Sequence, residues 1–130
     1  MLDVDYVITI HDQIIVEFGG LPGNASGGRG AVESALNRID NYIEYQDIND
    51  VFAIASLYAV TIARGHVFND GNKRTGLTCA LTYLYQQDIF IPQAEVLEEI
   101  MVDVASGAVE FEEFASILSV LWEQGGRMSP

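Results

Sequence analysis

The sequence predicts an all-α protein, a compact bundle of about six helices in one domain that spans residues 1–130. Apolar residues recur mostly three or four positions apart, and alternation with a period of two is scarce. A hydrophobic content of 49% with a positive mean hydropathy indicates a folded globule, and 130 residues suit a single core. No repeat, low-complexity segment or linker divides the chain.

Three helices are predicted in the first half. The first covers residues 3–18, with one apolar stripe at intervals of four residues: Tyr6, Ile10, Ile14 and Phe18. Residues 19–30 hold six glycines and one proline, which predicts a loop. The second helix covers residues 31–45 and uses Val32, Leu36, Ile39 and Ile43. The third covers residues 50–64 with Asp50 as its N-cap, and its apolar character on nearly every side predicts a central position.

Three further helices are predicted after a polar loop. They cover residues 72–86, 93–106 and 111–122, and residues 89–92 form a short extended segment between the first two of them. Gly76 lies within the helix at 72–86, where glycine costs about 1 kcal/mol relative to alanine. Close helix packing and close approach of a nucleotide both explain this glycine, and the sequence leaves the two explanations open.

Composition excludes several classes of function. A net charge of −13 with only six basic residues argues against direct nucleic-acid binding. The single cysteine, Cys79, excludes an internal disulfide, and its leucine and alanine neighbours predict a core position. The acidic N-terminus is unlike a signal peptide, and the most apolar run, residues 51–63, is shorter than the roughly 20 residues of a membrane span. We therefore expect a cytoplasmic protein without membrane contact.

The second half of the chain is markedly acidic. A solvated helix face is the simpler interpretation of these residues, and a surface for a basic partner protein is the alternative. The acidic residues are Glu95, Glu98, Glu99, Asp103, Glu110, Glu112, Glu113 and Glu123.

The most informative stretch is residues 66–74, HVFNDGNKR, between the third and fourth predicted helices. A helix N-terminus attracts anions through its unpaired N–H groups and its dipole. Gly71 allows close approach of a ligand to the backbone. Lys73 and Arg74 lie in the first helical turn, where the dipole disfavours cations, so both are expected to have an anionic partner. The stretch therefore predicts a phosphate-binding site.

This stretch resembles the signature of the Fic/Doc family. The family pattern is histidine, any residue, phenylalanine, any residue, an acid, a small residue, asparagine, a variable position and arginine. The chain fills it with His66, Phe68, Asp70, Gly71, Asn72 and Arg74, and places Lys73 at the variable position. Lysine there is typical of the Doc branch, whereas AMP-transferring Fic enzymes usually carry glycine. The segments 18–23 and 63–65 also resemble Doc proteins, so the likeness covers nearly the whole chain.

The resemblance implies a role for each motif residue. His66 is the catalytic base that takes a proton from an attacking hydroxyl. Asp70 is the ligand of Mg²⁺, although a turn residue is the simpler interpretation. The nucleotide phosphates are bound by Gly71, Asn72, Lys73, Arg74 and Arg64. Asn72 also suits the cap of the fourth helix, and Arg64 equally suits a helix-end cation stabilised by the dipole. Phe68 is expected to turn inward and anchor the loop, and His11 is expected to be structural.

The implied function is that of a Doc toxin from a toxin–antitoxin pair. Such a toxin is a protein kinase that transfers the γ-phosphate of Mg·ATP to a threonine of elongation factor Tu and blocks translation. The implied antitoxin binds through a C-terminal segment that forms a helix, and residues 118, 121 and 122 could line its groove unless they pack in the core. Two alternatives stay open: an AMP-transferase that tolerates lysine at position 73, and a catalytically silent protein-binding module.

Overall fold

A computed structural model describes residues 1–23 and 28–126 of the chain. These residues form six α-helices and one closing π-helical turn, without an extended strand, which confirms the all-α prediction. None of these helices is both long and apolar enough to cross a membrane. The elements are α1 (Val4–Phe18), α2 (Gly28–Gln46), α3 (Val51–Arg64), α4 (Asn72–Gln86), α5 (Glu95–Ser106), α6 (Phe111–Leu121) and the π-helix η1 (Trp122–Gly126).

The predicted helix boundaries are close to the observed ones. α2 begins at Gly28, three residues before the predicted start, and residues 24–27 of the predicted loop lie outside the described residues. The Asp50 side chain caps α3, as predicted, by accepting the Phe52 N–H. Residues 89–92 are non-helical, as predicted, and α5 starts two residues later than expected because Ala94 is still extended (φ −146°, ψ 154°).

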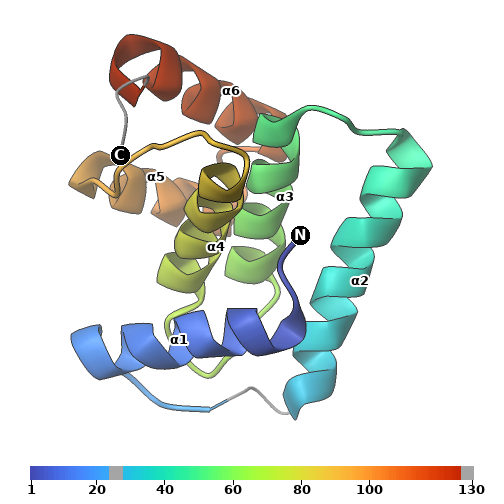
Figure 1. The fold of residues 1–130 in the computed structure, drawn as a ribbon. Helices are drawn as coiled ribbons and strands as arrows, with labels where there is room; N and C mark the ends of the chain where they lie inside the picture. Colours follow the sequence, from blue (N-terminus) through green and yellow to red (C-terminus); the bar gives the residue numbers. More distant parts are fainter. Residues whose placement is uncertain (24–27, 127–130) are drawn as a thin grey trace.

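The α3–α4 pair forms the centre of the bundle. Figure 1 shows the two helices side by side, with α1 across one end of the pair and α6 near the other. A Cβ atom at Gly76 of α4 would lie 2.8 Å from the carbonyl oxygen of Ala59 and 3.3 Å from the amide nitrogen of Ala63, both on α3. Close helix packing therefore explains this glycine, and the packing fixes the ends of the loop that joins α3 to α4.

The buried face of α1 differs from the predicted stripe. Tyr6 and Phe18 are 44% and 52% exposed, so only the two middle residues of the predicted stripe are buried. A spacing of four residues drifts by about 40° per step around an α-helix, so a stripe of three such steps leaves the buried face at both ends. The face that packs on the bundle consists of Val7, Ile10, His11 and Ile14.

The core contains the residues expected to be structural, together with some expected at a binding groove. Cys79 is fully buried, and burial raises the pKa of its thiol to about 12. Leu118 is also fully buried, while Leu121 and Trp122 are partly buried against the core. Leu118 therefore packs in the core, whereas Leu121 and Trp122 are only partly covered, so the antitoxin groove considered there stays a prediction.

Candidate active site

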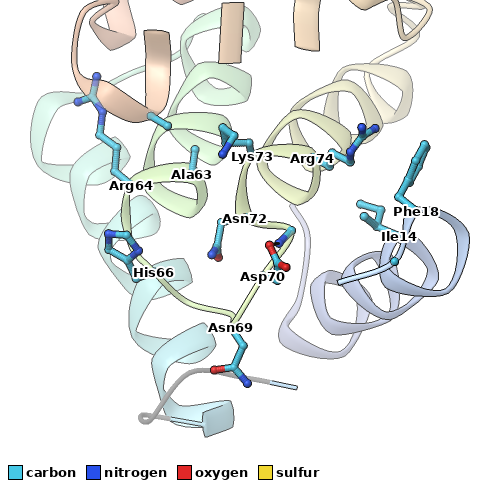
Figure 2. A pocket seen from close by; sticks show the side chains of 13 residues that line it. Ile14, Phe18, Ala63, Arg64, His66, Asn69, Asp70, Asn72, Lys73 and Arg74 are labelled. Atoms are coloured by element: carbon cyan, nitrogen blue, oxygen red, sulfur yellow. Dashed lines mark hydrogen bonds between the residues drawn. The ribbon is translucent and has the colours of Figure 1, made fainter. Parts of the chain in front are cut away.

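One cavity collects every candidate site residue. It has a volume of about 430 Å³ and opens where the α3–α4 loop and the first turn of α4 meet the C-terminal end of α1. Figure 2 shows Ile14 and Phe18 of α1 at one end of this cavity and His66 toward the other. The predicted residues that line it are Arg64, His66, Asp70, Gly71, Asn72, Lys73 and Arg74.

The loop is braced from within by Asn72. Its Oδ1 accepts the N–H of Phe68 at 3.0 Å, and its Nδ2 donates to the carbonyl oxygen of Phe68 at 3.0 Å. The prediction that Asn72 caps α4 is wrong, because the N-cap is Gly71 and no side chain caps the helix. Gly71 has a left-handed conformation (φ +79°), which glycine adopts without strain. The uncapped first turn of α4 leaves its amides for an anionic ligand.

Asp70 presents an exposed carboxylate that two backbone N–H groups orient. Its Oδ1 accepts the N–H of Gly71 at 3.0 Å, and its Oδ2 accepts the N–H of Leu21 at a longer 3.4 Å. A Cβ at Gly20 would lie 2.9 Å from Oδ2, so the loop after α1 approaches the carboxylate closely. No cluster of three or more potential metal-ligating acids, histidines or cysteines occurs among the residues described. A cation here would complete its coordination with phosphate and water oxygens, which is the manner of Mg²⁺.

The two motif cations differ in their surroundings. Arg74 donates from Nη1 to Glu98 Oε1 at 2.8 Å, and its guanidinium lies 3.9 Å from the centre of the Phe18 ring. Glu98 of α5 is therefore one anionic partner of Arg74. Lys73 is exposed and has no ion pair with any described residue. No described residue therefore supplies the anion expected beside Lys73.

Arg64 makes hydrogen bonds between helices of the bundle. Its Nε donates to the Val104 carbonyl at 2.7 Å, and its Nη2 donates to the Val109 carbonyl at 2.8 Å and to Glu110 at 3.2 Å. Figure 2 shows its guanidinium turned away from His66 and Asp70. These contacts join the end of α3 to α5 and to the α5–α6 connection, and they give no support to the phosphate contact expected of Arg64.

His66 is the exposed imidazole of the cavity. Its backbone φ of +48° is uncommon for a residue other than glycine, and such conformations concentrate at functional sites. In the view of Figure 2, His66 and Asp70 lie on either side of Asn72. The described residues make no hydrogen bond to the His66 ring, so both ring nitrogens are available to a substrate.

Comparison with known proteins agrees with the motif. The model of the Fic/DOC family matches residues 1–84, a range that includes α1 to α3, the whole loop and most of α4. The chain belongs to the Fic/Doc family. It is also similar to protein kinase doc of Escherichia phage P1, with 35% identity over 116 residues that cover 89% of this chain and 90% of that protein.

In this Fic/Doc protein, sequence reasoning missed the partner of Arg74, Glu98, and also the contact that His11 makes with the motif. His11 is fully buried, as a structural residue should be, but it lies directly against the active-site loop. Its Nε2 lies 2.7 Å from the carbonyl oxygen of Asp70, and its ring stacks on Phe68 with centroids 3.8 Å apart and planes at 5°. The prediction that Phe68 turns inward is confirmed, since it is 2% exposed. A histidine among the apolar residues of α1 was the available signal.

Proposed function

We propose that this Fic/Doc protein is a Doc-type toxin kinase that transfers the γ-phosphate of Mg·ATP to a hydroxyl group of a protein. The observation that carries the proposal is Lys73, an exposed lysine without an acidic partner among the described residues, beside an uncapped helix N-terminus. The same cavity holds the exposed imidazole of His66 and the carboxylate of Asp70. Similarity to a protein named protein kinase doc supports the same reaction.

The cavity is suited to a nucleotide and a divalent cation. Its volume of about 430 Å³ lies within the usual range for small-molecule sites, about 300–1,000 Å³. Lys73 and the amides of the first turn of α4 would bind phosphate oxygens. Asp70 would hold Mg²⁺, which when bound would neutralise part of the phosphate charge. Arg74 would contribute its remaining donors while Glu98 holds one side of its guanidinium.

The proposed transfer needs one base. A ring nitrogen of His66 takes the proton of the target hydroxyl while that oxygen forms a bond to the γ-phosphorus. The bond from the γ-phosphorus to the bridging oxygen breaks at the same time, and ADP leaves with the electron pair. Most of the rate comes from positioning and charge neutralisation, as in other phosphoryl transfers.

Lys73 decides which phosphate is transferred in this proposal. Its side chain would fill the space that a glycine at this position leaves for the α- and β-phosphates, and so favours presentation of the γ-phosphate to His66. AMP transfer would require the opposite orientation of the nucleotide. A silent binding module would have no need of His66, Asp70 and Lys73 together in one cavity.

The proposed target is a threonine of elongation factor Tu, so that phosphorylation blocks translation in the cytoplasm. The proposed restraint is a separate antitoxin whose C-terminal segment binds as a helix. Both follow from the resemblance to Doc toxins.

The direct test combines the purified protein with elongation factor Tu, Mg²⁺ and ATP, and maps phosphothreonine by mass spectrometry. His66→Ala is the matched control, because the exposed His66 ring makes no hydrogen bond to the described residues and its removal should leave the fold intact. We expect phosphothreonine with the wild type and a loss of about 10²–10⁴-fold in rate with the variant. Wild-type turnover by His66→Ala would exclude His66 as the base.

A further inference from the structure

His11 connects α1 to the active-site loop across 59 positions of sequence. It is fully buried, and its Nε2 lies 2.7 Å from the carbonyl oxygen of Asp70. Because a carbonyl oxygen only accepts hydrogen bonds, Nε2 carries the hydrogen and His11 is the donor. A buried hydrogen bond of this length fixes both of its partners.

The ring of His11 is itself fixed on several sides. It stacks in parallel on Phe68, and its Nδ1 lies 3.3 Å from Oδ1 of the exposed Asp12. A Cβ added at Gly71 would lie 3.6 Å from the ring, so the loop passes near the ring with no side chain between them. His11 therefore touches two residues of the motif, Phe68 and Asp70, without lining the cavity.

The peptide group between Asp70 and Gly71 links His11 to the carboxylate. The oxygen of this peptide accepts from His11, and its N–H donates to Oδ1 of Asp70 at 3.0 Å. The peptide is planar, so the direction of its C=O sets the direction of its N–H. His11 therefore sets the direction of the Gly71 N–H, which in turn orients the Asp70 carboxylate.

We propose that His11 is a positioning residue for the Asp70 carboxylate and, through it, for the divalent cation of the proposed reaction. The inference rests on the proposed function, because it takes Asp70 as the cation ligand. A purely structural His11 would need only its ring, which fills the space beside Phe68. A positioning His11 needs the Nε2 donor.

Two substitutions separate these roles. His11→Phe keeps a ring of similar size and the stacking on Phe68, but it has no donor. His11→Gln loses the ring and places an amide N–H near the position of Nε2. His11→Asn is the third variant, because its amide nitrogen corresponds to Nδ1 and falls short of the Asp70 carbonyl. If His11→Phe shows no thermal unfolding transition, and so does not fold, His11→Asn takes its place in the test.

The measurement is ATP affinity by calorimetry, once with Mn²⁺ as the cation and once with EDTA, for the wild type and each variant. The dissociation constant in EDTA divided by the one in Mn²⁺ gives the factor by which the cation tightens ATP binding. We expect His11→Phe and His11→Asn to reduce this ratio at least fivefold while the value in EDTA stays unchanged. We expect His11→Gln to retain the wild-type ratio within about twofold, even if its thermal midpoint falls.

An unchanged ratio in His11→Phe, or an equal fall in His11→Phe and His11→Gln, would overturn the inference. Asp70→Asn in the same assay tests the proposed function separately. A lost cation contribution in Asp70→Asn, together with an unchanged one in His11→Phe, overturns only the role of His11. If Asp70→Asn has the same ratio as the wild type, Asp70 is not the cation ligand. The role proposed for His11 is then overturned as well.

Discussion

Replacement of Gly76 by alanine should destabilise the protein, although alanine is the better helix former. A Cβ at this position would lie 2.8 Å from the carbonyl oxygen of Ala59 and 3.3 Å from the amide nitrogen of Ala63. Both are backbone atoms of α3 and cannot rotate away, so the helices must separate. Such overpacking costs about 2–3 kcal/mol, while the helix-propensity gain is about 1 kcal/mol. The net loss in the free energy of unfolding is therefore about 1–2 kcal/mol.

Gly30→Ala is the matched control. Gly30 lies in α2, does not have a positive φ, and a Cβ there would have no neighbour within 4 Å among the described residues. This variant should be stabilised by roughly 0.5 kcal/mol. Urea denaturation measures both differences, and for a chain of this length Gly76→Ala should also lower the thermal midpoint by roughly 4–8 °C. An increase in stability with Gly76→Ala, of the size seen with Gly30→Ala, would refute the close α3–α4 packing.

Further predictions concern the motif cations and the buried titratable groups. Lys73→Gly should lower γ-phosphate transfer by about 10–100-fold through the loss of a charged hydrogen bond, and unchanged transfer would show that Lys73 does not determine nucleotide orientation. A double-mutant cycle of Arg74 and Glu98 in urea should give a coupling below about 1 kcal/mol, because their side chains are 42% and 40% exposed; a coupling of several kcal/mol would contradict the exposed geometry. Burial raises the pKa of Cys79 to about 12, so thiol reagents at pH 8 should label it only after denaturation, and rapid labelling of the native protein would show that it is accessible. Burial also raises the pKa of Tyr58 to about 12, above its unfolded value near 10, so its contribution to stability should be complete below pH 10 and lost as the pH rises toward 12. Tyr58→Phe should reduce that alkaline loss in the free energy of unfolding, and an identical pH profile would refute it.

The helices and the position of the active-site loop could be predicted because they depend on local patterns. Apolar spacing locates the helices, Asp50 caps α3 as expected, and the cluster of polar residues after α3 predicts the loop. The inward direction of Phe68 and the core position of Cys79 also follow from their neighbours in sequence.

The contacts that complete the site could not be predicted because their partners are distant in sequence. Arg64 reaches carbonyl groups 40 and 45 positions away, and Arg74 pairs with Glu98, 24 positions away. The sequence shows that each arginine needs a partner but does not identify it. The role of His11 was hidden for a related reason: several sides of α1 are apolar, and only packing decides which side is buried.

The central claim is that this Fic/Doc protein transfers the γ-phosphate of ATP. The most direct measurement incubates it with elongation factor Tu and Mg²⁺ in two parallel reactions, one with γ-labelled and one with α-labelled ATP. We predict label on the target from γ-labelled ATP alone, and none with His66→Ala. Label from α-labelled ATP would instead place the protein among the AMP-transferases and contradict the role assigned to Lys73.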